Sequence, residues 1–155
     1  MTINAQIKPL SGEDIEQLNA YKSVETALQN PTDVEALFLN HAKLNEIPEE
    51  VTQFKNMIVL GLGENSISEI PDFVFRLEKL QHLGCSHNNI SFIPEGISGL
   101  KDLTTFKCWN NQISTVPVAL LSLPNIQIIE LKGNNIPKAE QKKLRKEYPN
   151  ISFLF

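Results

Sequence analysis

Four consecutive segments of the chain have the same length and align beneath one another without a gap. They are VEALFLNHAKLNEIPEEVTQFKN (34–56), MIVLGLGENSISEIPDFVFRLEK (57–79), LQHLGCSHNNISFIPEGISGLKD (80–102) and LTTFKCWNNQISTVPVALLSLPN (103–125), each of 23 residues. A fifth segment begins in the same register at Ile126 and then departs from it. Such a period is typical of stacked repeat proteins, because one unit cannot bury its apolar face alone whereas adjacent units can.

The apolar residues recur in the same columns of every segment. Positions 4 and 6 alternate as in a strand with one buried face. Position 4 holds Leu37, Leu60, Leu83, Phe106 and Ile129, and position 6 holds Leu39, Leu62, Cys85, Cys108 and Leu131. Proline at position 15 keeps the residue before it out of regular helix, and the apolar residues three apart at positions 18 and 21 suit a short helical or 3₁₀ turn. Each unit is therefore predicted to be a strand followed by such a turn.

Position 9 carries an asparagine in four of the five units. These residues are Asn65, Asn88, Asn111 and Asn134, and the first unit has Ala42 instead. A buried amide at a turn can bond the backbone of its own turn and of its neighbours. We predict a structural asparagine ladder along the stack, with an atypical first unit.

This pattern resembles the leucine-rich repeat family. The consensus L-x-x-L-x-L-x-x-N-x-L is met by Leu80, Leu83, Cys85, Asn88 and Ile90. The continuation I-P-x-x-[VI]-x-x-[FL] resembles the 23-residue subtype of bacterial proteins and of intracellular Ras-group relatives. The resemblance covers residues 34 to about 136. It implies an α/β solenoid with a curved parallel sheet on the concave side and short helical or 3₁₀ turns on the convex side.

We predict a single domain over residues 1–155. Residues 1–33 form a helical N-terminal cap, 34–125 hold the four repeats, and 126–155 hold a fifth partial repeat and a C-terminal cap. In the first cap, Ser11 is the expected N-cap of one helix and residues 23–29 form a second, so that the cap shields the open edge of the first strand. In the last cap, a helix is expected over residues 138–147, after which Ile151, Phe153 and Phe155 pack on the final repeat.

Side chains that flank positions 4 and 6 are expected to point into water on the concave face. Gly61, Gly63 and Gly84 leave a shallow trough there, which suggests close approach by another molecule. Trp109 would stand beside this trough, as hot-spot residues of interfaces do; alternatively, its ring lies flat over neighbouring repeats. The predicted protein-binding residues are Phe38, Val59, Glu64, His82, Lys107, Trp109, Glu130 and Lys132.

Other site classes find little support in the sequence. Ser86 and His87 are chain neighbours on alternate faces and do not suit a nucleophile and base pair, and GLGENS (61–66) lacks the third glycine of a phosphate-binding motif. His41, His82 and His87 are expected on the concave face, and His82 and His87 are interpreted as polar surface residues, so we expect no metal site and no cofactor. Cys85 and Cys108 are interpreted as reduced core residues, although adjacent strands would also permit a disulfide.

Charge and hydropathy restrict the partners. The formal charge of −4 makes the chain a poor binder of phosphate backbones, and KAEQKKLRKEY (138–148) is interpreted as the solvated face of a helix rather than as an anion-binding patch. No segment approaches the ~20 apolar residues of a membrane span, and no signal peptide is recognised. We expect a cytoplasmic, monomeric, non-enzymatic module that binds a protein or peptide. The alternative is a structural protein that self-assembles through its caps or its convex face, and an enzyme is a remote alternative.

Overall fold

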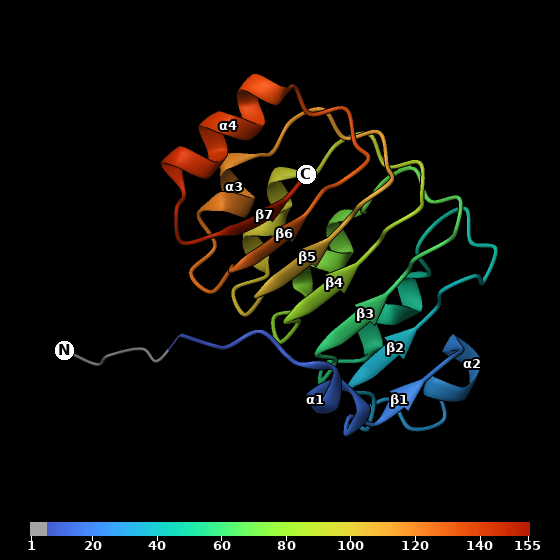
Figure 1. Ribbon diagram of the computed structural model, residues 1–155. Helices are drawn as coiled ribbons and strands as arrows, with labels where there is room; N and C mark the ends of the chain where they lie inside the picture. Colours follow the sequence, from blue (N-terminus) through green and yellow to red (C-terminus); the bar gives the residue numbers. More distant parts are fainter. Residues whose placement is uncertain (1–5) are drawn as a thin grey trace.

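Seven short strands form one parallel sheet whose spatial order follows the sequence (Figure 1). The structure is a computed structural model and describes residues 6–155. The strands are β1 (Ala20–Tyr21), β2 (Ala36–Phe38), β3 (Val59–Gly61), β4 (His82–Gly84), β5 (Thr105–Lys107), β6 (Ile128–Glu130) and β7 (Ser152–Leu154). From β2 to β6, residues one period apart are partners in register, so Leu60 pairs with Leu37 on one side and with Leu83 on the other.

Short helical segments connect the strands on the other side of the sheet (Figure 1). They are the 3₁₀ helices η1 (Glu49–Gln53), η2 (Asp72–Arg76) and η3 (Glu95–Gly99) and the α-helix α3 (Val118–Leu121). Each begins directly after a proline with extended backbone, namely Pro48, Pro71, Pro94 and Pro117. The helical turn therefore starts only after this proline in every unit. Together with the parallel sheet, these turns confirm the predicted solenoid architecture.

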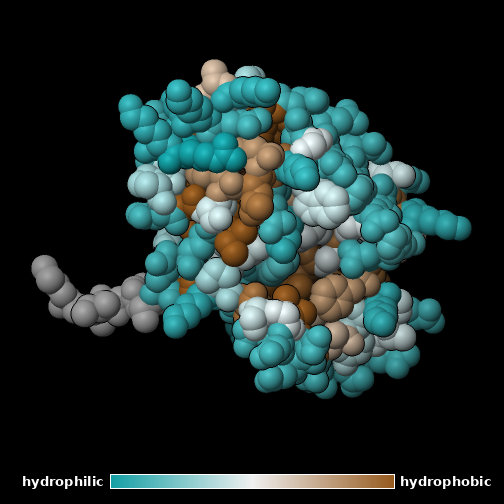
Figure 2. Space-filling view, in the orientation of Figure 1, coloured by the Kyte–Doolittle hydropathy of each residue, from teal (hydrophilic) through white to brown (hydrophobic). Residues whose placement is uncertain are grey.

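The core lies between the sheet and these helical connections. Every position 4 side chain, from Leu37 to Ile129, is fully buried, and Cys85 and Cys108 are buried among them. Burial of an aliphatic or aromatic side chain of this size contributes about 1.5–3 kcal/mol, so the recurring columns supply the main driving force for stacking. The outer surface is mostly hydrophilic, and apolar residues gather along a hollow between hydrophilic flanks (Figure 2).

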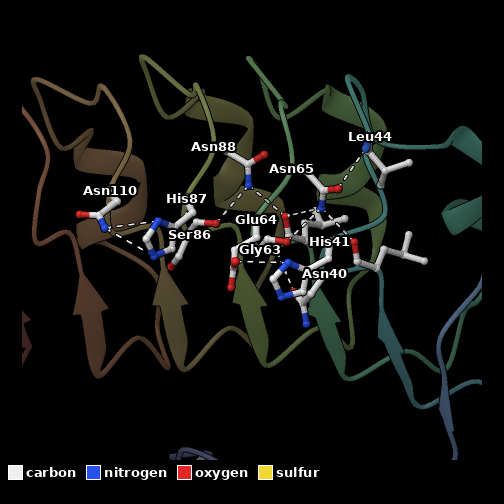
Figure 3. A network of polar contacts seen from close by, with 12 residues as sticks. Asn40, His41, Leu44, Gly63, Glu64, Asn65, Ser86, His87, Asn88 and Asn110 are labelled. Carbon is white, nitrogen blue, oxygen red and sulfur yellow. Dashed lines mark hydrogen bonds and ion pairs between the residues drawn. The ribbon is translucent and has the colours of Figure 1, made fainter.

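Asparagine side chains join successive units beyond the carboxyl ends of the strands (Figure 3). Asn88 Oδ1 accepts a hydrogen bond from the Ile67 amide at 2.9 Å, while Asn88 Nδ2 donates to the Leu62 carbonyl at 2.9 Å and to the Cys85 carbonyl at 3.1 Å. Asn65, Asn111 and Asn134 make the equivalent bonds in their own units. Each amide thus satisfies backbone groups of two units that the turn would otherwise leave buried and unpaired.

The residue before each ladder position has left-handed backbone, a feature that the sequence analysis did not identify. The φ angles at position 8 are 58° for His41, 57° for Glu64, 55° for His87, 51° for Asn110 and 74° for Gly133. A non-glycine residue in this region costs on the order of 1 kcal/mol. The strain is offset by a repeated bond between units, in which, for example, the His87 amide donates to the Trp109 carbonyl at 2.9 Å.

Both ends of the sheet are completed by strands, which the sequence did not predict. At the N-terminal end, α1 (Gly12–Glu16) and α2 (Val24–Ala27) are separated by β1, which pairs with β2. At the C-terminal end, α4 (Lys138–Glu147) occupies the predicted range and is followed by β7, which pairs with β6. The extra strands form because the outer backbone groups of β2 and β6 need hydrogen-bond partners.

The N-terminal segment also reaches far beyond the first strand. The Ile7 amide donates to Asn125 Oδ1 at 3.0 Å, and Gln127 Nε2 donates to the Ile7 carbonyl. Figure 1 shows this segment running from the fifth unit past the amino-terminal ends of the strands to α1. This region therefore contacts the far end of the stack in addition to pairing with the first repeat strand. Within residues 6–155, every helix is too short or too polar to traverse a lipid bilayer.

The Asn88→Ala variant should be less stable than the wild type by roughly 3 kcal/mol, because it leaves several buried backbone groups unpaired. Urea-induced unfolding monitored by circular dichroism measures this difference. Asn89→Ala is the matched control, since the adjacent Asn89 side chain is exposed, and it should change stability by less than about 0.5 kcal/mol. Equal losses in the two variants would contradict a structural role for the ladder.

Candidate functional site

A pocket of about 290 Å³ opens on the concave face of the sheet. Its floor comes from β3 and β4, and its walls come from β2, from β5 and from Ile15 of α1. The lining residues are Ile15, Phe38, Asn40, Val59, Gly61, Gly63, Glu64, His82, Gly84, Ser86, His87, Lys107 and Trp109. The pocket thus draws on four strands and on a helix from the N-terminal segment.

The three glycines of the expected trough have different roles. A Cβ atom on Gly61 would lie 2.9 Å from Phe38 Cδ1, and one on Gly63 would lie 3.1 Å from Asn40 Oδ1. These two glycines make room for side chains of the preceding unit, so their absence of side chains does not in itself point to a ligand. Only Gly84 is open, because a Cβ atom there would have no neighbour closer than 3.9 Å. Gly84 therefore forms the exposed floor of the pocket.

Aromatic side chains line the two sides of this floor. Phe38 is half-buried and packs over Gly61. On the other side, 37% of Trp109 is exposed, and its ring meets the His87 ring edge-on, with centroids 4.3 Å apart and an interplanar angle of 72°. Trp109 is therefore held by an aromatic neighbour while it lines the pocket, an arrangement that presents apolar area with little loss of side-chain freedom.

Three of the position 3 residues are not in water, contrary to the prediction. Ala36, Val59 and Thr105 are at most 2% exposed. The N-terminal segment lies along this edge of the sheet, and its Ile15 shares the pocket wall with Val59. Val59, a predicted binding residue, consequently offers almost no surface of its own and belongs to the base of the wall.

His82, which was predicted to be a polar surface residue, is instead half-buried, and its Nδ1 is fully buried. Burial and, second, the nearby Lys107 ammonium lower the pKa of His82 from 6.5 to about 4. Its Nδ1 is buried and has no hydrogen-bond partner within residues 6–155. Since a buried N–H without an acceptor is more costly than a bare nitrogen, we assign the proton to Nε2. A Cβ atom on Gly84 would lie 4.0 Å from this Nε2, so the donor is above the pocket floor.

The charged residues of the concave face are mostly paired. Lys107 Nζ lies 3.2 Å from Glu130 Oε1, and His41 Nδ1 lies 3.2 Å from Glu64 Oε2 (Figure 3). Glu130 therefore adjoins the pocket through Lys107 without lining it. Lys132 is exposed and lies outside the lining. Six of the eight predicted residues line the pocket, namely Phe38, Val59, Glu64, His82, Lys107 and Trp109.

The sequence analysis did not identify several of the lining residues as binding residues. Asn40, Ser86 and His87 stand at positions 7 and 8, so the repeat columns held a signal for them. Ile15 carried no such signal, because it lies outside the repeats and only the folded N-terminal segment brings it to the pocket. The missed residues add hydrogen-bonding groups to a site that the prediction described mainly by its aromatic and charged members.

The geometry offers little for metal binding or nucleophilic catalysis. Within the described part of the chain, no three histidine, cysteine, aspartate or glutamate side chains are grouped to hold a metal ion. Cys85 Sγ lies 2.8 Å from Cys108 Sγ, and both thiols are free and buried. Burial, together with the Cys85 side chain, raises the pKa of the Cys108 thiol well above its usual value. This thiol therefore stays protonated and is a poor nucleophile.

Comparisons with known proteins include matches to leucine-rich repeats. A family model described as leucine rich repeat matches residues 55–108. Among solved structures, a leucine-rich repeat protein of Leptospira interrogans has 30% sequence identity and a TM-score of 0.76. Internalin C2 of Listeria monocytogenes has 27% identity and a TM-score of 0.64, and a plant ice-binding protein has 28% identity and a TM-score of 0.58. A search of curated proteins found no match.

The matches cover most of this chain but only part of the other proteins. The alignment with the Leptospira protein covers 89% of this chain and 35% of that one. For internalin C2 the shares are 76% and 50%, and for the plant protein they are 66% and 35%. The chain therefore spans between about a third and a half of the length of these structures.

Stability should fall as the pH is lowered from about 6.5 to about 4 because of His82. The unfolded chain binds a proton on this histidine near pH 6.5, whereas the folded chain does so only near pH 4, so acidification between these values favours unfolding. Near pH 4.5 the loss should be roughly 2–3 kcal/mol, at about 1.4 kcal/mol per pKa unit.

Urea titrations at a series of pH values measure this loss, and His82→Gln should reduce it. Lys107→Met should reduce it by less, because the ammonium is the second cause of the pKa shift. A His82→Gln variant that loses as much stability on acidification as the wild type would contradict this account.

Proposed function

Because the chain is a leucine-rich repeat protein, we propose that it is a non-enzymatic interaction module that binds a peptide or protein on its concave sheet face. Fold alone does not establish function, since one scaffold can carry unrelated sites. The proposal therefore depends on the pocket. Its proposed binding residues are Phe38, Val59, Glu64, His82, Lys107, Trp109, Glu130 and Lys132, with Val59 acting from the base of the wall.

One observation carries the proposal: the open floor at Gly84 lies between aromatic side chains. Phe38 and Trp109 line a pocket of about 290 Å³, and a side chain of a partner would bury its apolar surface against both. Aromatic anchors around a central hollow are the residues that dominate binding energy in interfaces. The volume suits one or two side chains of a peptide rather than a large ligand.

Further features belong to the same proposal. The 23-residue period favours the subtype found in bacterial proteins and Ras-group relatives, and the Leptospira and Listeria structures support a bacterial affiliation. The free thiols of Cys85 and Cys108 suit a reducing compartment such as the cytoplasm. We further propose that the chain acts as a monomer, which sedimentation velocity would test.

The double variant Phe38→Ala/Trp109→Ala should lose binding to its partner by at least about tenfold, because each substitution removes an aromatic anchor. Partners recovered from the native cell lysate by the immobilised wild type are identified by mass spectrometry, then purified for titration with each variant. Phe92→Ala/Val118→Ala is the matched control: it also removes two exposed apolar side chains, at residues that do not line the pocket. Circular dichroism checks that all variants fold.

The single variant Trp109→Ala separates a loss of binding from a loss of stability. Phe38 packs on Gly61, whereas Trp109 is partly exposed, so its removal should disturb the fold less. Equal affinity of the wild type and the Phe38→Ala/Trp109→Ala variant would contradict binding on the concave face. A loss confined to Phe92→Ala/Val118→Ala would move the site away from the pocket. Concentration-dependent sedimentation would instead favour the self-assembly alternative, for which Leu154 on the edge strand β7 is 49% exposed.

A further inference from the structure

We infer that the concave pocket recognises a side-chain carboxylate of its partner next to an apolar side chain, so that the partner is an acidic peptide segment. This inference rests on the proposed function and adds the chemistry of the ligand. It comes from the polar groups that surround the open floor at Gly84. Most of them are hydrogen-bond donors, and the acidic groups nearby are already paired.

The first donor is the imidazole of His82. Its buried Nδ1 has no partner within residues 6–155, and we have therefore assigned the proton to Nε2. This Nε2 lies 4.0 Å from the position that a Cβ atom on Gly84 would occupy, a position that a ligand atom is free to approach. An N–H in this setting requires an acceptor, and the oxygen of a carboxylate is a strong one.

The second donor is the ammonium of Lys107, which supplies positive charge to the same end of the pocket. Lys107 lines the pocket and is close enough to His82 to lower its pKa. Its side chain is 37% exposed, and its Nζ lies 3.2 Å from Glu130 Oε1. An ammonium has three N–H groups, so it can hold Glu130 and a ligand carboxylate together. The hydroxyl of Ser86 lines the same pocket.

A cationic ligand fits these groups less well. Glu64 also lines the pocket, but its side chain is 53% exposed and contacts His41, while Glu130 contacts Lys107. Lys107 lies near His82 and would repel a cation at that end of the pocket. A carboxylate instead meets a neutral donor and a positive charge, while the neighbouring side chain of the ligand lies on Gly84 between Phe38 and Trp109.

An array of synthetic ten-residue peptides tests the inference. It combines random sequences with Asp/Glu or Asn/Gln at matched positions, each made with a free or an amidated C-terminus. Replacing the decisive carboxylate by its amide should weaken binding by about tenfold or more, as expected for a hydrogen-bonded charge. Loss on Asp/Glu→Asn/Gln supports the inference, whereas loss on amidation alone would identify a C-terminal carboxylate and overturn it.

Three variants assign the effect to the pocket. Gly84→Leu should abolish binding by filling the floor, which has room for a side chain. Lys107→Met/Glu130→Gln removes the ion pair as a whole and should reduce the preference for acid over amide to less than about twofold, since the neutral His82 donor alone discriminates weakly. Lys101→Met is the matched control, because it removes the same charge from an exposed residue outside the pocket lining and outside the proposed binding residues, and it should preserve the preference.

The outcomes separate the two proposals. Peptides whose binding depends on Phe38, Trp109 and Gly84 but not on any carboxylate would overturn the inference and leave the proposed function intact. Binding that survives both Gly84→Leu and Phe38→Ala/Trp109→Ala would overturn the proposed function as well. No binding to the wild type above that to Gly84→Leu would count against both. An acid preference that Lys101→Met removes would place the carboxylate site outside the pocket.

Discussion

The hydrogen bonds that each ladder asparagine makes to two units are the interaction on which the rest of the structure depends. Asn88 joins the amide of Ile67 in the preceding unit to the carbonyl of Cys85 in its own, and the left-handed residue before it turns the chain off the strand. Apolar columns alone would drive stacking without setting a register. The repeated bonds hold each strand against its neighbour, and so they fix where the side chains of positions 5, 7 and 8 stand on the concave face.

The pocket arises where this regularity is interrupted. Gly84 has no covering side chain, whereas Gly61 and Gly63 are covered by Phe38 and Asn40 of the preceding unit. His82 stands in a column whose neighbours, Val59 and Thr105, are buried beside the N-terminal segment. A uniform stack would present a flat sheet. These exceptions produce a local hollow with polar donors at one end and aromatic surface at its sides, which is the combination that a specific recognition site requires.

The comparisons illustrate how little the scaffold alone says about binding. Similar solenoids occur in an internalin and in a plant protein described as ice-binding, and both share under a third of their sequence with this chain. The backbone course is common because the buried columns and the ladder repeat. The concave side chains are free to differ, since they do not take part in stacking. Any account of this protein's role must therefore be argued from residues such as Trp109 and Lys107.

The sequence by itself determined the solenoid, because positions 4, 6 and 15 and the asparagine column act locally and recur at a constant interval. It also placed Phe38, His82, Lys107 and Trp109 on one face, since side chains alternate along a strand. Only the tertiary structure decided that Val59 is covered, that Ile15 joins the pocket and that Gly84 alone is open. These features depend on contacts between residues far apart in the chain, such as Ile7 with Asn125. A repeat period carries no information about contacts of that kind.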